Sequence, residues 1–341
     1  MKKVTLKDIA QESGVSIMTV CYILNGRDKL FRPQTRQTVL ATAARLGYKP
    51  NAAAKAVLTG RFGCVALLFA ENAICSELPT PLLSGIQDEL ELHDLHLVLS
   101  RFAAQEGSDR QAVPKVLRQA LADGLLVYAP RDLPQPLEEQ LALPQPPLVW
   151  IGRERPTDAV YADLRAAAAK AVQELASRGH RRIPFLYPAT DPTDKVQHCQ
   201  LQPRLEGYQA AMAAAGLTPQ PVELPADNGG WMEPCQRLLA TSERPTALLT
   251  LCEMVADVAM FAAAKAGLSV PGDLSLMALL APEWTVGGQA LAAMEDPQHE
   301  VGRRAAQMLL QKIKQPQEPI PAAAIPCQFL AGETIGPAPA G

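Results

Sequence analysis

The chain has 341 residues, of which 48% are hydrophobic and 20% are charged, and its formal net charge is −3. This composition supports large folded cores and excludes a small disulfide scaffold or a disordered chain. No apolar run reaches the roughly 18 residues of a membrane-spanning helix, and no apolar signal segment precedes Asp8. The seven cysteines are scattered and form no CxxC pair, so we expect reduced thiols in a cytoplasmic protein without membrane contact.

The small net charge conceals two parts of opposite sign. Residues 1–62 hold 11 Lys and Arg against three Asp and Glu, a formal charge of +8, and the remaining residues carry −11. A basic segment on an acidic body is typical of a polyanion-binding module joined to a separately folded domain, and nucleic acid is the obvious polyanion. On charge alone, a solvated basic face without a partner is the alternative interpretation.

The first sixty residues predict three short helices. Thr5 precedes a helix that runs through Ser13 and ends at Gly14, and Thr5 with Asp8 has the spacing of a capping box. Ser16 can cap a second helix, Ile17–Leu24, and a third is expected over 33–46. Its expected inner face consists of Val39, Leu40, Ala43 and Leu46. Two helices joined by a short turn containing Gly form a helix-turn-helix, which places the second helix in a DNA major groove.

Two runs in this segment carry a family resemblance. VTLKDIAQESGVSIMTVCYILNG (4–26) and TRQTVLATAARLGYKPNAAAKAVLTGR (35–61) resemble the DNA-binding headpiece of the lactose/galactose repressor (LacI/GalR) family. The resemblance implies that Ser16, Thr19, Asn25 and Thr35 hold phosphates and that positions 17, 18 and 22 reach base edges. The full set assigned to DNA binding is Thr5, Ser16, Ile17, Met18, Thr19, Tyr22, Asn25, Thr35, Arg36, Lys55, Val57 and Leu58.

The positions that reach base edges depart from the family pattern. The family usually continues TVSRVLN, where this chain reads TVCYILN, so Cys21 and Tyr22 replace Ser and Arg. An Arg there can bind guanine bidentately, which is worth about 1–3 kcal/mol of discrimination, and Tyr cannot. Ile17 and Met18 are apolar and suit a thymine methyl, so we expect an unusual, A·T-richer half-site. The alternative is a weakened headpiece that relies on phosphates and DNA shape.

The stretch 50–60, PNAAAKAVLTG, resembles the hinge helix of the family. That helix folds on the operator and inserts a leucine into the minor groove, where an apolar wedge kinks the DNA. Val57 matches the position of this leucine and Leu58 lies beside it, so either residue can be the wedge. A short Ala-rich helix is marginal alone, which favours folding only when two hinges meet on DNA.

The rest of the chain alternates strand-like and helix-like segments. Strands are expected at 64–70, 96–100, 124–128, 148–151, 183–186, 247–251 and 274–279, and helices at 82–92, 111–122, 164–178, 204–215 and 255–267. This order implies parallel sheets with helices on both faces. The number of strands favours two lobes with a ligand in the cleft between them. Segments 130–147 and 227–230 have loop composition.

Later segments extend the resemblance over most of the chain. They are VYADLRAAAAKAVQELASRGHRRI (160–183), RLEGYQAAMAAAG (204–216), RPTALL (244–249), AGLSVPGDLSL (266–276) and DPQHEVGRRAAQML (296–309). The implied fold is an N-terminal all-α helix-turn-helix headpiece plus an α/β periplasmic-binding-protein-like core of two Rossmann-like lobes, homodimeric and sensing a small molecule. The expected organisation is headpiece 1–49, hinge linker 50–62, two-lobe effector-binding and dimerisation core 63–335, and flexible tail 336–341.

The resemblance also implies an effector-binding set. Arg204 matches an arginine suited to paired hydroxyls or a carboxylate, Trp231 an aromatic that stacks on the ligand, and Asp163 a polar position of the second lobe. The candidate set is Tyr128, Asp163, Arg204, Trp231, Cys252 and Leu280. For Arg204 and Trp231, an interlobe salt bridge and a core aromatic are the alternative roles.

Several polar positions of the family's sugar site are missing. The ligand-binding aspartate becomes Leu280, Cys252–Glu253 replaces the usual Asn-Asp, and Tyr128 and Gly152 stand where polar contacts often lie. Each sugar hydroxyl left without a partner costs about 1–3 kcal/mol, so an ordinary hexose is disfavoured. A less polar or aromatic effector, a protein corepressor or no effector all stay open.

Three classes of function compete for this sequence. A ligand-gated transcription regulator, most simply a repressor on a pseudopalindromic operator in double-stranded DNA, accounts for the basic segment, the turn spacing and the body together. A solute-binding protein would need a signal peptide where the headpiece stands. An enzyme would need a nucleophile elbow, phosphate loop or metal motif, and none is present. His93 and His96 lack further ligands nearby, so we expect no metal and no cofactor. The operator, the effector and the sign of regulation stay open.

Overall fold

The computed structural model describes residues 4–24, 30–49, 60–71, 78–103, 117, 121–128, 133, 135–143, 146–189, 195–241, 243–279 and 283–339. The chain forms two compact units, Met1–Phe62 and Gly63–Gly341. The expected hinge helix, except for Gly60, and most of the expected helix 111–122 lie outside the described residues. Among the described helices, none is both long and apolar enough to cross a membrane.

The first unit contains the three expected helices, α1 (Leu6–Ser13), α2 (Ile17–Leu24) and α3 (Pro33–Arg45). The capping box of α1 is formed, because the backbone N–H of Thr5 donates to Asp8 Oδ2 at 2.8 Å and the Asp8 N–H donates to Thr5 Oγ1. Gly14 ends α1 at φ 68°, a left-handed conformation that glycine adopts without strain. The turn between α1 and α2 is therefore short and defined.

A small apolar core holds these helices together. Ile9, Val20 and Val39 are fully buried, one from each helix. The expectation that Leu40 faces inward is wrong: it is 42% exposed, and Thr42 is buried instead. The turn of about 100° per residue makes positions 39, 42, 43 and 46 share one face of α3 and turns Leu40 away.

The first sheet of the second unit consists of β1 (Cys64–Glu71), β2 (His96–Ala103), β3 (Gly124–Tyr128), β4 (Leu148–Ile151), β5 (Ala159–Ala162) and β13 (Ala323–Ile325). Its order is β13–β5–β4–β3–β1–β2 and every pairing is parallel. The second sheet consists of β6 (Phe185–Pro188), β7 (Pro221–Leu224), β8 (Ala247–Thr250), β9 (Ser275–Leu279), β12 (Ala292–Glu295) and β14 (Gln328–Leu330). Its order is β14–β12–β9–β8–β6–β7, parallel except for β14 against β12.

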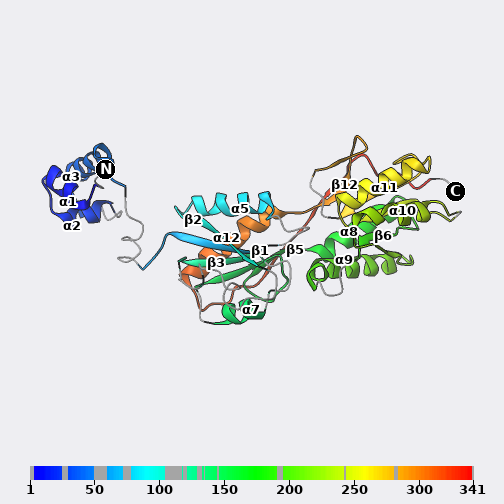
Figure 1. Ribbon diagram of the computed structural model, residues 1–341, viewed down its shortest axis with the longest axis horizontal. Helices are drawn as coiled ribbons and strands as arrows, with labels where there is room; N and C mark the ends of the chain where they lie inside the picture. The colour runs from blue at the N-terminus through cyan, green and yellow to red at the C-terminus, as the bar shows by residue number, and fades with distance from the viewer. Residues whose placement is uncertain are drawn as a thin grey trace. The chain divides into compact units, whose positions relative to one another are not determined.

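Helices cover both faces of each sheet, so there are two lobes (Figure 1). The first lobe has α5 (Thr80–Glu91) and α12 (Gln298–Lys314) on one face and α7 (Gln135–Ala142) on the other. The second has α8 (Leu164–Ser177) and α9 (Lys195–Ala214) on one face, and α10 (Met232–Leu239) and α11 (Glu253–Lys265) on the other. Successive residues of β1 enter opposite cores, which explains its unbroken apolar run. The expected fold class is thereby confirmed.

The chain passes between the two lobes three times within the described residues. The passages run from β5 into α8, from β12 into α12, and from β13 into β14. Residues at these three passages belong to neither lobe alone.

Glycines allow two helix pairs to cross at very short range. A Cβ added to Gly302 of α12 would lie 2.3 Å from the carbonyl oxygen of Leu82 in α5, and one added to Gly207 of α9 would lie 2.2 Å from the carbonyl oxygen of Arg165 in α8. Both neighbours are backbone atoms, which cannot move aside alone. These two crossings, α5 with α12 and α8 with α9, therefore require glycine.

Several elements differ from the sequence expectations. Segment 130–147, expected to be a loop, contains α7, and α9 begins at Lys195, before the expected start at Arg204. A short 3-10 turn, Asn228–Gly230, lies in the expected loop 227–230. A short ribbon of β10 (Thr285–Val286) and β11 (Gln289–Ala290) was not expected, nor were β5, β7, α10, β12, α12, β13 and β14.

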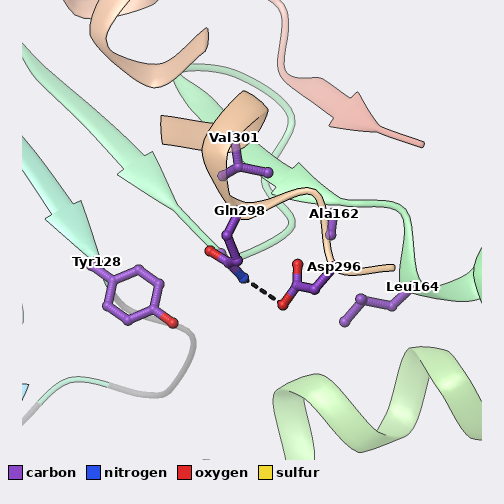
Figure 2. A pocket seen from close by; sticks show the side chains of 7 residues that line it. Tyr128, Ala162, Leu164, Asp296, Gln298 and Val301 are labelled. Carbon is purple, nitrogen blue, oxygen red and sulfur yellow. Dashed lines mark hydrogen bonds between the residues drawn. The ribbon is translucent and has the colours of Figure 1, made fainter. Parts of the chain in front are cut away.

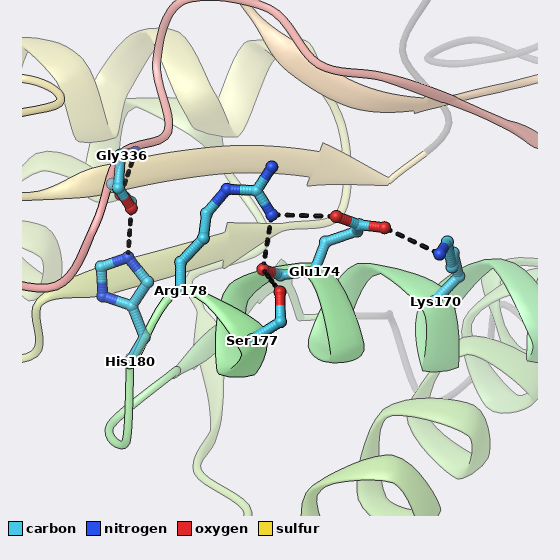
Figure 3. A network of polar contacts seen from close by, with 7 residues as sticks. Lys170, Glu174, Ser177, Arg178, His180 and Gly336 are labelled. Atoms are coloured by element: carbon cyan, nitrogen blue, oxygen red, sulfur yellow. Dashed lines mark hydrogen bonds and ion pairs between the residues drawn. The ribbon is translucent and has the colours of Figure 1, made fainter.

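The expectation of a flexible tail from Gly336 is wrong for residues 336–338. The N–H of Ala338 donates to the carbonyl oxygen of Arg178 at 2.8 Å, and the N–H of Gly336 donates to Ser275 Oγ at 2.9 Å. His180 is fully buried, and its Nε2 lies 3.1 Å from the carbonyl oxygen of Gly336 (Figure 3). Its Nδ1 lies 2.9 Å from Thr246 Oγ1, so the imidazole links the tail to the second lobe.

Candidate DNA-binding surface and ligand pocket

The start of α2 presents polar groups in a fixed arrangement. The backbone N–H of Thr19 donates to Ser16 Oγ at 3.1 Å, and the hydroxyls of Ser16 and Thr19 lie 2.9 Å apart. Ser16 thus acts as the N-cap that the sequence predicts, and its side chain stays exposed. A helix N-terminus with exposed hydroxyls and N–H groups suits a phosphate.

Next to this cap, α2 exposes two apolar side chains. Ile17 is 48% and Met18 63% exposed, while Val20 and Ile23 of the same helix are buried. These two apolar side chains lie beside the polar start of α2, where they are available to contact a partner. Tyr22 is only half-buried, and its ring centroid lies 6.3 Å from that of Phe31 at a tilt of 31°.

Of the other candidate DNA-binding residues, three lie in the described part of the chain and four lie outside it. Arg36 is exposed and Thr35 half-buried, both in the first turn of α3. The Thr5 hydroxyl donates to Asp8 Oδ2 at 2.6 Å as part of the capping box. The remaining candidates lie outside the described residues: Asn25, Lys55, Val57 and Leu58.

A pocket that is partly open to solvent lies in the second unit at the carboxyl ends of β3, β4 and β5. It is completed by the first residues of α8 and α12 and by the passage between β12 and α12. Its lining is Tyr128, Gly152, Ala162, Leu164, Asp296, Gln298 and Val301 (Figure 2). The carboxyl edge of a parallel sheet is where α/β folds bind ligands.

Asp296 and Gln298 are the polar side chains with the most defined geometry in this lining. The amide nitrogen of Gln298 donates to Asp296 Oδ2 at 2.6 Å. Asp296 Oδ1 and Gln298 Oε1 are buried and have no hydrogen-bond partner among the described residues. Burial raises the pKa of Asp296, and the hydrogen bond from Gln298 and the charge of Arg204 only partly oppose this effect.

The structure brings part of the predicted effector set to this pocket. Tyr128 lines it, and Asp163 lies between two lining residues, where its carboxylate caps α8 by accepting from the Ala166 N–H at 3.0 Å. Arg204 is buried and electrostatically coupled to Asp296, and burial lowers its pKa to about 10. Arg204 therefore lies behind the pocket wall without lining it.

Two other members of the set are not among the lining residues. Trp231 is 5% exposed, packs in the core of the second lobe and donates from Nε1 to the carbonyl oxygen of Pro225 at 2.7 Å. This environment favours the core-aromatic alternative. Cys252 is the N-cap residue of α11, and Leu280 lies outside the described residues.

Sequence reasoning missed Asp296 and Gln298 as site residues. Both belong to the segment 296–309, which carried only the family resemblance. A polar DPQ sequence directly after an apolar run was the available signal, since side chains at the end of a parallel strand face the ligand edge of the sheet.

Comparisons with known proteins agree with both parts of this description. Residues 5–51 match the family described as bacterial regulatory proteins, lacI family, and residues 172–335 match the periplasmic binding protein-like domain. The chain therefore contains a lacI-family DNA-binding domain and a periplasmic-binding-protein-like domain. It is 26% identical over 314 residues to the catabolite control protein A of Priestia megaterium, covering 90% of this chain and 91% of that protein.

Other relatives are similar over comparable lengths. The ribose operon repressor of Escherichia coli K12 is 29% identical over 325 residues, covering 92% of this chain and 94% of that protein. The structure of a lac repressor dimer bound to operator and the anti-inducer ONPF superimposes with a TM-score of 0.77 at 20% identity, covering 98% and 99% of the two chains. A complex of the transcriptional regulator CelR with cellobiose gives 0.64 at 23% identity, covering 97% and 100%. These two likenesses concern the fold.

Proposed function

We propose that this protein is a cytoplasmic transcriptional repressor, not an enzyme, that binds a pseudopalindromic operator in double-stranded DNA as a homodimer. The observation that carries the proposal is α2, which combines a polar N-terminus at Ser16 and Thr19 with the exposed side chains of Ile17 and Met18. Two copies of α2 would lie in successive major grooves. Several phosphate contacts in each headpiece make binding steeply salt-dependent.

Base reading in this proposal rests on apolar contact. Ile17 and Met18 would press on thymine methyl groups, and Tyr22 replaces an arginine that would favour guanine, so the half-site is A·T-richer. The competing proposal is that phosphates and DNA shape carry the binding. The hinge around Val57 and Leu58 would occupy the central minor groove.

Gating by a small molecule is the second part of the proposal. The pocket at Tyr128, Asp296 and Gln298 lies where the chain passes between the lobes, so a ligand there can favour one lobe orientation. An effector shifts operator occupancy only by its difference in affinity for the two states. A protein corepressor, or constitutive action without an effector, is the alternative; a solute-binding protein is disfavoured because it leaves α2 without a role.

Exposed apolar side chains of the second lobe support the homodimer. Met254 and Phe261 on α11 are 45% and 55% exposed, and Trp284 beside β10 is 40% exposed. Trp284 Nε1 lies 3.4 Å from Asp257 Oδ1, so this side chain is fixed to α11. An ordered apolar surface of this kind is typical of a protein contact.

The test is selection of genomic fragments by the purified full-length protein at a fixed, near-physiological salt concentration. An enriched palindrome supports the proposal, and fragments without a shared motif contradict it. Tyr22→Ala should change the preferred bases, whereas Arg36→Ala should weaken binding to all sequences alike. Uniform loss in both variants would contradict the base-reading role of Tyr22.

A further inference from the structure

The pocket lining contains one charged side chain. Asp296 is the charged residue of the lining, and the remaining lining residues are apolar or neutral. Nearby carboxylates add to its charge, because Asp163 caps α8 at the pocket edge and Glu295 precedes Asp296. The carboxylates at the lining and its edge are negative, with the buried Arg204 as the opposing charge behind them, and an anionic ligand would meet repulsion at the carboxylate of Asp296.

Asp296 Oδ1 and Gln298 Oε1, the acceptor pair, both need a hydrogen-bond donor. Both atoms are buried, and neither has a hydrogen-bond partner among the described residues. The amide nitrogen of Gln298 already donates to Asp296 Oδ2 at 2.6 Å, so the amide oxygen can accept from a different donor. Figure 2 shows Gln298 and Asp296 on one side of the pocket and the Tyr128 ring opposite them. Such oxygens are costly to bury unless a donor reaches them.

Arg204 does not supply the missing donor to Asp296 Oδ1. Its charge attracts Asp296, yet burial is the larger effect and the pKa of Asp296 stays raised. Arg204 is itself 5% exposed and is not among the residues that line the pocket. Its charge thus offsets only part of the effect of burial on Asp296.

We propose that the pocket binds a small molecule with a protonated amino group, held by Asp296 Oδ1 and Gln298 Oε1. This inference rests on the proposed effector site and names the chemistry of its ligand. An ammonium group supplies donors to both oxygens and the positive charge that the carboxylate needs. The ring of Tyr128 and the side chains of Leu164 and Val301 provide the surface for the rest of the molecule, and an aromatic face also favours a cation.

The experiment uses full-length protein and matched probes that differ in the amino group: D-glucosamine against D-glucose, D-galactosamine against D-galactose, and 1,5-diaminopentane against 1,5-pentanediol. Thermal shift and calorimetric titration measure binding. We expect at least one amine to bind more tightly than its neutral counterpart. Asp296→Asn should then weaken that amine by at least about tenfold, the smaller end of the range for a charged hydrogen bond. Glu233→Gln, which removes the same charge from an exposed site on α10, should leave its affinity unchanged.

Three results would overturn the inference: a neutral probe that binds as tightly as its amine, an amine affinity that survives Asp296→Asn, or no binding by any amine. If Asp296→Asn does not fold, Gln298→Met removes the other acceptor and should weaken the amine as well. The regulator function fails separately, when fragment selection without any probe yields no shared motif. A palindrome together with ligands that bind without an amino group refutes only the ligand class.

Discussion

Ser16 offers the sharpest test of the DNA-binding surface, because two substitutions separate its structural role from contact with a phosphate. Its hydroxyl oxygen accepts the Thr19 N–H at 3.1 Å, so Ser16→Ala removes the cap of α2. Loss of such a cap costs about 1 kcal/mol. An aspartate keeps an acceptor at the cap and favours the helix N-terminus by about 0.3–1 kcal/mol. Ser16→Asp therefore preserves α2 but places a negative charge where a phosphate would lie.

The magnitude on DNA follows from Coulomb's law. Two unit charges about 4 Å apart repel by about 1 kcal/mol in water and about 4 kcal/mol at an effective dielectric constant of 20. A dimer has two such positions, so Ser16→Asp should weaken operator binding by at least about 2 kcal/mol, or about thirtyfold. The control is Ser177→Asp, which adds the same charge at an exposed residue that ends α8.

Two assays on the full-length protein check this reasoning. Hydrogen exchange of residues 17–24 should accelerate about fivefold in Ser16→Ala and stay unchanged in Ser16→Asp. Fluorescence anisotropy with the selected operator should show a larger loss of DNA affinity in Ser16→Asp than in Ser16→Ala. If Ser16→Asp binds DNA as well as the unmodified protein, Ser16 is only a helix cap, and the phosphate assignment is refuted.

Three further predictions concern the second unit. Gly302→Ala should lower the free energy of unfolding by about 1–3 kcal/mol in urea titrations, because its Cβ would lie 2.3 Å from the Leu82 carbonyl oxygen; unchanged stability would mean that the two helices separate at no cost. Lys312→Met should lower the free energy of unfolding by about 1–3 kcal/mol, because Asp158 keeps its hydrogen bond from the Ile320 N–H but loses the ammonium at 2.8 Å, and adding Asp158→Asn should recover part of the loss. Burial lowers the pKa of His180 below its ordinary value of 6.5, so the unfolded chain binds a proton that the folded chain does not. The free energy of unfolding should therefore fall as the pH drops below about 6.5, and the fall should be smaller in His180→Gln.

The headpiece could be predicted in detail because its signals are local. Thr5, Asp8, Gly14 and Ser16 cap or end helices through neighbours three or four residues away, and the structure has all these features. The expectation that Leu40 is buried was wrong because Leu40 and Val39 are adjacent apolar residues, and only Val39 faces the core. In so small a core, one residue of rotation decides which of two apolar neighbours is buried.

Two of the missed helices, α7 and α10, share a property that misleads sequence reasoning. Pro136 lies in the first turn of α7 and Pro234 in the first turn of α10, where a proline is compatible with a helix. Read along the sequence, the same prolines indicate loops. Pro203 likewise marked an apparent helix start, yet α9 continues through it. The short strand β12, AAME, lacks β-branched residues and is specified by its neighbours β9 and β14.

The pocket could not be predicted because it is assembled from distant segments. Tyr128 and Ala162 end two strands, Gly152 directly follows a third, and Asp296 and Gln298 come from a passage more than a hundred residues later. The family resemblance indicated Trp231, whose indole packs in the core of the second lobe. Only the packing of α12 on the first sheet brings the acceptor pair to the ends of β3, β4 and β5.

This placement also limits how the pocket could regulate the protein. Asp296 follows β12 of the second lobe, and Gln298 begins α12 of the first, so a donor shared by their oxygens ties together residues that precede and follow one passage. If one lobe orientation lets the donor reach both oxygens and the other lets it reach one, the two states differ by about one charged hydrogen bond, about 1.5–3 kcal/mol. A difference of that size changes the affinity for the operator by about tenfold to 150-fold, which is the usual range of allosteric coupling. The acceptor pair would thus account for gating without a second ligand-binding residue, provided that loss of either oxygen reduces the effect of ligand on DNA binding more than it reduces ligand affinity.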